Sequence, residues 1–414
     1  MKILFLSDDF PPKSFGGAGI ITFNLAKGLL DAGHKMYAIT TTQDRKEEGW
    51  SNVEGIEVYN LYVDYDGRFA AYVSLCNPKV ILKVKKLIKD INPEVIHAHN
   101  IHHYLSYYTL AVARSFTSKV FLTTHDAMSF NYGKLVNFYD RKNLEVQKDF
   151  SYKVGFLQNL RTAKKRYNPI RNIAIRWYLN TFPKKIFAIS HELKKALNQN
   201  GIKNVETIHY GIESRDWNVS EEEKKTFSTK LGLDTKKIVF FGGRLSEFKG
   251  GKIMIDTMKE LSEKDRDIVL LIAGTLNDYS KYLLNYAEEI GVMNNIFFTG
   301  WLSRDDMKKA YAVCDVCVTP SIYFDAFNLF NIEAGSASKP VVGTCFGGTP
   351  EIVIDKVTGL IVNPNNIEIL SNAIYTIVED KEYTTKLGKA GNERVKEYFT
   401  MDRYVIETLS WYQK

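Results

Sequence analysis

Cysteine is scarce in this chain, and long apolar runs are absent from it. Only four cysteines are scattered over the 414 residues, which indicates a reducing compartment rather than a disulfide-rich secreted fold. No run approaches the ~20 consecutive apolar residues of a membrane-spanning helix. The apolar stretch at the N-terminus, Ile3–Leu6, is too short for a signal peptide. We therefore expect a cytoplasmic protein whose first apolar stretch is a β-strand.

Metal ligands in a recognisable pattern are also lacking. Cys314 and Cys317 form a CxxC pair, but no second pair of ligands at suitable spacing accompanies it. Four histidines crowd the end of one predicted strand, with no carboxylate or cysteine interleaved among them. We therefore predict no metal site here. The four are His97, His99, His102 and His103.

The net charge of +7 is unevenly distributed along the chain. Residues 131–180 contain eleven basic and three acidic side chains, a net charge of +8, with aromatic residues interleaved. Such a segment suits an anionic surface: a phosphate-bearing acceptor, lipid headgroups or nucleic acid. A solvated basic face without a partner is the alternative. No nucleic-acid recognition module is present, so we expect no nucleic-acid partner.

Short runs that are apolar on both faces alternate with helical patterns along most of the chain. Such runs are typical of parallel strands covered by helices on both sides. Their alternation with helices predicts an α/β fold with a doubly wound, Rossmann-like sheet in each half. The predicted strands are Ile3–Ser7, Met36–Thr41, Gly55–Asn60, Val95–His99, Val120–Thr124, Lys185–Ser190, Ile238–Gly242, Ile268–Gly274, Ile296–Gly300, Val316–Pro320, Val341–Thr344 and Gly359–Val362.

The composition becomes charged and irregular over residues 213–237. Because 414 residues exceed one ordinary hydrophobic core, we predict a domain boundary at the start of this segment. The predicted domains are residues 1–212 and 213–391. Residues 392–414 form a helical pattern, which we expect to pack back on the N-terminal domain.

Two glycine-rich turns directly follow predicted strands. Gly16 and Gly17 belong to the sequence FGGAG, which precedes an amphipathic helix. Glycines let a backbone approach a phosphate, and a helix N-terminus offers free N–H groups. Arg244 and Lys249 lie five residues apart in the sequence GGRLSEFKGG. Both can converge on one anion, and a diphosphate would suit the pair.

Three further ionisable side chains follow predicted strands, either directly or in the next helix. Asp325 lies in a predicted loop at the carboxyl end of a strand, which is where α/β sheets bind ligands. Glu333 follows about two turns into a helix that should begin near Phe327. His125 ends the strand Val120–Thr124 and should reach the same edge of the first sheet.

No single motif identifies a protein family, but the order of the motifs along the chain does. The series GGAG, TTHD, GGRLSEFKG, PSIYFDAFNLFNIEA, KPVVGTCFGGTPE and VTGLIVNP resembles the retaining glycosyltransferases of the glycogen-synthase and sucrose-synthase-like superfamily. It resembles most the family-4 type, which builds bacterial cell-surface polysaccharides and glycolipids. The match runs from Met1 to about Asn365. It implies a GT-B fold, with two Rossmann-like domains facing across a cleft, an acceptor domain first and a donor domain second, and no metal or cofactor.

The resemblance also implies roles for residues that match the family motifs. Gly16 and Gly17 match the turn that closes over the donor diphosphate. Arg244 and Lys249 match the pair that neutralises this diphosphate. Glu333 matches the glutamate that holds the ribose hydroxyls.

The remaining matches include two departures from the family pattern. His125 matches the histidine near the reacting sugar, and Phe327, Asn328 and Leu329 fall where backbone amides meet the sugar and phosphates. Asp325 falls on a second glutamate, which touches the donor sugar. Asp is one methylene shorter than the usual Glu. Asn328 replaces the usual glycine, and asparagine can still adopt a left-handed backbone. These changes would retune the donor choice or mark an inactive relative.

Together these features predict a retaining, metal-independent glycosyltransferase. Its donor would be a nucleoside-diphosphate sugar, with a UDP-sugar favoured, and its acceptor a saccharide or a lipid-linked saccharide. The predicted catalytic residues are His125, Arg244, Lys249 and Asp325. We also expect residues 131–180 to contact the anionic inner leaflet of the membrane. A nucleotide-sugar 2-epimerase, a phosphorylase and a non-catalytic nucleotide-sugar-binding relative remain open as alternatives.

Overall fold

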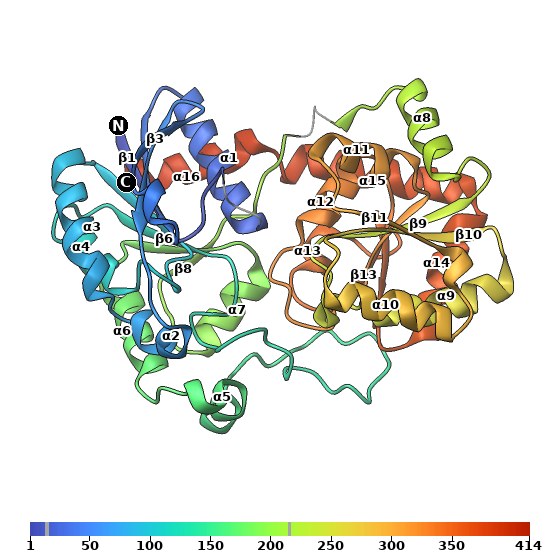
Figure 1. Ribbon diagram of the computed structural model, residues 1–414, viewed down its shortest axis with the longest axis horizontal. Helices are drawn as coiled ribbons and strands as arrows, with labels where there is room; N and C mark the ends of the chain where they lie inside the picture. Colours follow the sequence, from blue (N-terminus) through green and yellow to red (C-terminus); the bar gives the residue numbers. More distant parts are fainter. Residues whose placement is uncertain (13–15, 214–216) are drawn as a thin grey trace. The chain divides into compact units, whose positions relative to one another are not determined.

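The computed structural model describes residues 1–12, 16–213 and 217–414, and it divides into two compact units. Phe15 of the first glycine motif lies outside the described residues. Both termini belong to the first unit (Figure 1). The first unit comprises Met1–Leu135, Ser151–Gly211 and Met401–Lys414, and the second comprises Val136–Phe150 and Ile212–Thr400.

The first unit is built on a sheet of eight strands among the described residues, in the order β3-β4-β2-β1-β5-β6-β7-β8. Neighbouring strands are parallel except for the antiparallel β3–β4 pair. The strands are β1 (Lys2–Ser7), β2 (Lys35–Thr42), β3 (Gly49–Val53), β4 (Ile56–Tyr62), β5 (Val95–His99), β6 (Val120–Thr124), β7 (Lys185–Ala188) and β8 (Val205–Thr207).

Helices cover this sheet because its central strands are apolar on both faces. All residues of β5 and β6 are buried, as the continuous apolar runs predict. The helices are α1 (Gly17–Asp31), α2 (Ala70–Val73), α3 (Pro78–Ile91), α4 (Tyr108–Arg114), α5 (Phe156–Ala163), α6 (Arg171–Thr181), α7 (His191–Gln199) and α16 (Met401–Gln413), with short 3-10 turns η1 (Arg45–Glu47), η2 (Gly67–Phe69) and η3 (Lys164–Arg166).

The C-terminal helix α16 packs against α1 and against β5, β6 and β7 of the first sheet. A Cβ atom on Gly28 of α1 would lie 2.5 Å from the Val405 Cγ2 atom, so glycine permits this close helix contact. The Tyr412 hydroxyl lies 2.5 Å from the Nδ1 atom of His97 on β5. Both side chains are buried, so the last helix completes the core of the first unit.

The second unit is built on a parallel sheet with the order β11-β10-β9-β12-β13-β14. Its strands are β9 (Lys237–Gly242), β10 (Ile268–Ala273), β11 (Ile296–Gly300), β12 (Val316–Thr319), β13 (Val341–Thr344) and β14 (Gly359–Val362). Its helices are α8 (Glu221–Leu231), α9 (Gly251–Lys264), α10 (Asp278–Glu289), α11 (Arg304–Val313), α12 (Leu329–Ser336), α13 (Thr349–Ile352), α14 (Ile367–Glu379) and α15 (Lys381–Tyr398), with 3-10 turns η5 (Glu247–Lys249) and η6 (Met293–Asn295).

Strand alternation divides the core of this unit into two layers. Val239 and Phe241 of β9 belong to the cluster that packs under α9, α10 and α14. Phe240 points to the opposite face, because successive side chains of a strand alternate. There its ring contacts Tyr311 of α11 and Phe330 of α12, with ring centroids 5.0 and 5.2 Å away. Both faces of the sheet are therefore covered (Figure 1).

The predicted strands are confirmed, but two further strands escaped the sequence pattern. The missed strands are β3 and β8, which are short and carry polar side chains. The structure also divides the chain differently from the predicted boundaries. Residues 136–150 belong to the second unit, and the boundary falls between Gly211 and Ile212. Residues 392–414 are split between α15 of the second unit and α16 of the first.

Aromatic packing explains why residues 136–150 join the second unit. The rings of Phe138 and Phe150 each have their centroid 5.6 Å from that of Phe346. The Asn363 side chain also donates hydrogen bonds to the carbonyl oxygens of Asn143 and Glu145, at 2.8 and 2.9 Å. Among the described residues, no helix is both long enough and apolar enough to cross a bilayer.

Candidate functional site

Two loops meet at the point where the strand order of the second sheet reverses, between β9 and β12. The loop after β9 contains Lys249, and the loop after β12 contains Asp325. The Ile322 N–H donates to the Phe248 carbonyl at 2.9 Å, which joins the loops. Gly250 has a φ of +82°, and a Cβ atom on it would lie 2.1 Å from the Pro320 carbonyl oxygen. Such a reversal point is where open α/β sheets bind ligands.

Lys249 and Asp325 form an ion pair across these loops. Their Nζ and Oδ2 atoms are 2.6 Å apart, and the two side chains are 26% and 11% exposed. The Lys249 ammonium also lies 5.5 Å from the centroid of the Tyr323 ring. Burial acts to lower the pKa of Lys249, but the Asp325 carboxylate and Tyr323 outweigh it and raise this pKa above its usual value. A permanent cation is thus held beside a carboxylate at the sheet edge.

The glycine-rich turn of the motif KPVVGTCFGGTPE, which follows β13, positions the backbone of Asp325. The Gly348 N–H donates to the Asp325 carbonyl at 2.9 Å. Gly347 has a φ of +64°, and a Cβ atom on it would lie 2.1 Å from the same carbonyl oxygen. Only glycine fits this approach without strain. Three motifs that are far apart in the sequence therefore meet at Asp325, where Lys249 contacts the carboxylate and the glycines contact the backbone carbonyl.

The helix after Asp325 begins at Leu329, two residues later than the sequence predicted. Asn328 is its N-cap, and its side-chain oxygen accepts a hydrogen bond from the Phe330 N–H at 3.2 Å. The backbone of Asn328 is extended, with φ −88° and ψ 107°, so the left-handed conformation considered from the sequence is not used. The Phe327 side chain is buried and packs on Phe399 with ring centroids 5.7 Å apart. The first turn of α12 leaves backbone N–H groups without helical partners.

Glu333 lies one turn further along α12. Its Oε2 atom accepts a hydrogen bond of 2.8 Å from the hydroxyl of the fully buried Tyr311. Burial raises the pKa of Glu333 to about 7, although the Tyr311 hydrogen bond and the Arg304 charge oppose this. The carboxyl group is thus close to half-ionised at neutral pH, with a hydroxyl donor already in place.

Arg244, the other predicted partner of the diphosphate, is placed differently. It lies in the loop after β9, where its side chain is exposed and forms no ion pair with any described residue. The structure therefore brings Lys249 and Asp325 into contact and leaves Arg244 open to solvent. In the first unit, Gly16 caps α1 with an extended backbone (φ −114°, ψ 144°), and Gly17 is the first residue of this helix.

His125 follows β6 in the first unit and is 8% exposed. Its Nε2 atom lies 3.2 Å from the Nδ1 atom of His99, and its Nδ1 atom contacts the Tyr210 hydroxyl. Burial lowers the pKa of His125 to about 4, although the nearby charge of Asp126 opposes this. The imidazole is therefore neutral at pH 7, and both ring nitrogens are engaged. Sequence reasoning missed both partners because they come from distant segments.

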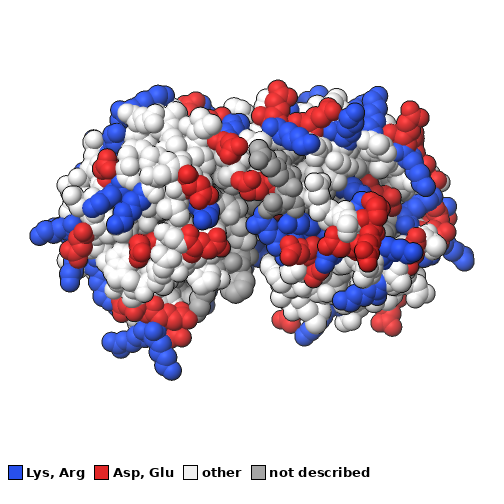
Figure 2. All heavy atoms as spheres, turned by 90° about the horizontal axis from the view of Figure 1, so that it is seen from above, with Lys and Arg blue, Asp and Glu red and all other residues white. Residues whose placement is uncertain are grey.

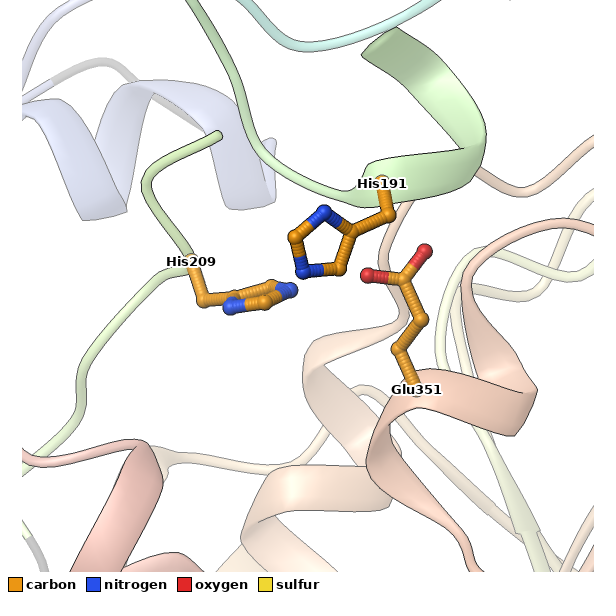
Figure 3. A group of neighbouring side chains, drawn as sticks. All are labelled: His191, His209 and Glu351. Atoms are coloured by element: carbon orange, nitrogen blue, oxygen red, sulfur yellow. The ribbon is translucent and has the colours of Figure 1, made fainter. Parts of the chain in front are cut away.

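The predicted histidine group does not gather into a single cluster of ligands. His97 and His99 stand side by side on β5 with ring centroids 4.2 Å apart, and the His97 nitrogens contact Thr123 and Tyr412. A separate pair, His191 and His209, has ring centroids 5.1 Å apart (Figure 3). Glu351, also labelled in Figure 3, lies on α13 of the second unit.

A pocket of about 630 Å³ opens at the carboxyl ends of β1 and β2 in the first unit. Asp8, which lines it, accepts hydrogen bonds from the N–H groups of His103, Tyr104 and Leu105 at 2.7, 3.1 and 2.7 Å. Burial raises the pKa of Asp8 to about 6, although these hydrogen bonds oppose it. The sequence did not single out this pocket. Its lining is Asp8, Asp9, Phe10, Thr41, Thr42, Gln43, Asp44, His103 and Tyr104.

Two family models match successive parts of the chain. The model for Glycosyltransferase Family 4 matches residues 15–215, and the model for glycosyl transferases group 1 matches residues 223–394. The chain belongs to the family-4 glycosyltransferases. A glycosyltransferase of Methanocaldococcus jannaschii is 27% identical to it over 420 residues, covering 100% of this chain and 98% of the relative. Glycogen synthase of Mycobacterium tuberculosis is 22% identical over 427 residues, covering 100% and 94%.

Solved structures of glycosyltransferases share the architecture of this protein. Sucrose-phosphate synthase of Thermosynechococcus elongatus superposes with a TM-score of 0.77 at 20% identity, covering 100% of this glycosyltransferase and 98% of that chain. The HepE protein of Anabaena, solved in complex with UDP, superposes with a TM-score of 0.70 at 20% identity, covering 99% and 100%. The predicted GT-B fold, with two Rossmann-like units, is confirmed.

Proposed function

We propose that this glycosyltransferase transfers a sugar with retention of configuration, without a metal, from a nucleoside-diphosphate sugar to a saccharide or lipid-linked acceptor in cell-surface glycan synthesis. The Lys249–Asp325 pair at the reversal point of the second sheet carries the proposal. A UDP-sugar is the favoured donor. In support, the HepE protein of Anabaena was solved with UDP and with UDP-glucose.

Donor binding would separate Lys249 from Asp325, and each of the two side chains would then contact the donor. Lys249, now paired with Asp325, would turn its charge to the donor diphosphate, and the exposed Arg244 would fork a second set of oxygens. The N-terminus of α12, which begins at Leu329, adds the positive potential of the helix dipole to the same unit. These groups stabilise the charge that grows on the leaving diphosphate, as an oxyanion hole does for an acyl transfer.

Carboxylates would hold the two sugars of the donor. Asp325, released from Lys249, would accept hydrogen bonds from hydroxyls of the transferred sugar. Glu333 would accept them from the ribose hydroxyls, with Tyr311 fixing one of its oxygens. Because burial raises the pKa of Glu333 to about 7, donor binding should strengthen as the pH rises through neutrality.

Retention would follow if the acceptor attacks from the face that the diphosphate leaves. The bond from the anomeric carbon to the diphosphate oxygen breaks, and the bond to the acceptor oxygen forms. The acceptor proton passes to a diphosphate oxygen, so no protein base is required. His125 is neutral and already bonded to His99 and Tyr210, so it would contact the sugar only by exchanging one of them.

The pocket of the first unit favours a hydroxyl-rich acceptor. Its lining contains three carboxylates, Asp8, Asp9 and Asp44, and no lysine or arginine. Carboxylates accept hydrogen bonds from sugar hydroxyls and repel phosphates. A saccharide end of the acceptor would therefore enter here, while any charged lipid anchor would be held elsewhere.

The basic segment offers a place for a lipid surface. Residues 151–180 contain seven basic side chains and no acidic ones, whereas residues 136–150, in the second unit, contain three of each. Exposed apolar and basic side chains mix on α5, η3 and α6, a composition typical of helices that lie on anionic membranes. By contrast, both signs of charge alternate on the face shown in Figure 2. The exposed side chains are Phe156, Leu157, Leu160, Ile170, Ile173 and Trp177, with Arg161, Lys164, Lys165, Arg166 and Arg176.

Co-sedimentation with vesicles tests the membrane contact. The protein should bind vesicles that contain phosphatidylglycerol at low salt and should be released by high salt. A variant with Lys164, Lys165 and Arg166 changed to Gln should lose this binding, while one with Arg141, Lys142 and Lys148 changed to Gln should keep it. Equal binding to neutral and anionic vesicles would contradict the proposal.

A donor screen tests the activity itself. Thermal shifts with UDP-, GDP- and ADP-sugars should identify one nucleotide class that stabilises the folded protein. Incubation of that donor with and without saccharide acceptors should then give a glycosylated product only with an acceptor. A donor sugar that changes configuration without an acceptor would indicate the 2-epimerase. Binding without turnover over a broad acceptor panel would indicate a non-catalytic relative.

A further inference from the structure

The second unit also has a pocket, and this pocket takes no part in the proposed transfer. Its volume is about 630 Å³, and it lies beside the C-terminal end of α12, whereas Asn328 caps the N-terminal end of this helix. An eight-residue helix spans about 12 Å, so the pocket and the cap residue Asn328 lie at opposite ends of α12, with Glu333 between them. The side chains of interest in its lining are Trp217, Lys224, Ser336, Lys339, Asn392 and Lys396.

The described lining of this pocket is basic. It contains three lysines and, over the part of the chain that the structure describes, no carboxylate. The Lys339 ammonium donates one hydrogen bond of 2.7 Å to the Cys314 carbonyl, which leaves two N–H groups for a ligand. Lys224 pairs at 2.5 Å with Glu221, whose side chain is 89% exposed and thus easily displaced. Lys396 is exposed on the last turn of α15.

Ser336, one of the lining residues, has a buried hydroxyl that finds no partner among the described residues. Ser336 is 5% exposed, and its Oγ atom forms no hydrogen bond with any described residue. Asn392 holds this end of α12 in place, because its side chain donates to the Ser336 carbonyl at 2.7 Å. An unsatisfied buried hydroxyl destabilises the folded chain, so its presence beside three lysines points to a ligand that bonds to it.

We propose that this pocket binds a small phosphorylated metabolite. Its phosphate would lie among Lys224, Lys339 and Lys396 and would accept a hydrogen bond from the Ser336 hydroxyl. Trp217 supplies an apolar wall for the organic part, and its ring is fixed by Tyr311 with centroids 5.5 Å apart. The volume suits a sugar phosphate or a mononucleotide.

Calorimetry with defined probes tests this pocket. Glucose 6-phosphate and AMP should bind, while glucose and adenosine should not, and binding should persist when UDP saturates the donor site. Lys396→Gln should weaken binding about tenfold, the loss of one charge-assisted contact, whereas Lys389→Gln, an exposed position on the same helix, should not. Binding that UDP abolishes, binding indifferent to Lys396→Gln, or no binding of either phosphorylated probe would overturn the proposal.

The Ser336→Ala variant gives an independent test, because stability and ligand binding should change in opposite directions. Removing the unpartnered hydroxyl should raise the melting temperature of the ligand-free protein and, in the same variant, weaken binding of glucose 6-phosphate or AMP. A variant that is less stable without ligand would show that the hydroxyl already has a partner in the folded chain. That result would overturn the assignment of Ser336 as a ligand contact.

Discussion

The first sheet carries buried imidazoles on β5 and after β6 and the carboxyl group of Asp8 after β1, whereas the second sheet ends in the Lys249–Asp325 ion pair and the carboxyl group of Glu333. Burial lowers the pKa of His97 and His102 to about 3 and that of His125 to about 4, so these rings are neutral. In the second unit Lys249 keeps its charge beside Asp325. The difference favours the second unit as the one that holds a diphosphate, because Lys249 places a half-buried cation where its strand order reverses.

His125 in the first unit and Glu333 in the second make opposite contributions to the pH dependence of stability. For His125, whose pKa falls on folding, the stabilisation is complete above pH 6.5 and is lost as the pH falls through about 4. For Glu333, whose pKa rises on folding, the stabilisation is complete below pH 4.5 and is lost as the pH rises through about 7. Acid should therefore remove the stabilisation that His125 contributes, and neutral to alkaline pH should remove the stabilisation that Glu333 contributes.

The largest effect is expected for Lys249→Ala. This change removes the cation and leaves the Asp325 carboxylate buried without it, which is costly. We expect turnover to fall at least tenfold with any active donor, because the leaving diphosphate loses its main charge partner. The measurement is an initial rate at saturating acceptor, with Lys259→Ala, an exposed lysine on α9, as the control. An enzyme indifferent to Lys249→Ala would refute the diphosphate site.

The Glu333→Gln variant should be more stable than the native chain but should bind the donor more weakly. The amide cannot ionise, so the variant should melt at a higher temperature than the native chain at pH 8, with a smaller gain at pH 5. Its donor affinity should fall about tenfold, because charge-assisted bonds to the ribose are lost. Melting curves and donor titrations at both pH values check this. Glu393→Gln, at an exposed position on α15, should leave donor affinity unchanged. A constant stability gain at both pH values would argue against a raised pKa at Glu333.

His125→Gln should reduce the acid sensitivity of the first unit. Removing one group that binds a proton only on unfolding lowers the slope of the unfolding free energy by up to about 1.4 kcal/mol per pH unit between pH 4 and 6.5. Urea unfolding across this range measures the slope. If the slope of the variant equals that of the native chain, the imidazole is not buried in its neutral form.

The smallest effect is expected for Asn328→Gly, which restores the usual family residue. Glycine replaces asparagine at an N-cap with a loss of only a few tenths of a kcal/mol. The extended backbone of this residue suits either side chain, so donor affinity should change less than twofold. A donor titration checks this. A large gain in affinity would mean that the Asn328 side chain obstructs the donor.

Sequence periodicity predicted the central strands because continuous apolar runs are buried on both faces, as in β5 and β6. It failed for β3, whose alternating pattern is short and half-exposed, and for residues 136–150, whose Phe138 and Phe150 pack on a distant Phe346. The motif order located Lys249 and Asp325, while their direct contact depends on two loops joined through Phe248 and Ile322.

Other parts of the site left no mark in the sequence. Tyr210 and His99 contact His125 from segments far along the chain, so no local spacing could indicate them. The raised pKa of Glu333 results from burial under Tyr311, which only the folded packing reveals. Local patterns therefore identify which loops carry charged residues, and long-range packing decides which of those residues meet.

Calorimetric titration of UDP into three proteins tests the contrast between the two units most directly. The native chain should bind UDP, Lys249→Ala should bind it at least tenfold more weakly, and His125→Gln should bind it within twofold of the native affinity. This pattern would place the diphosphate on the second unit alone. Unchanged binding by Lys249→Ala, or an equal loss in His125→Gln, would contradict the account.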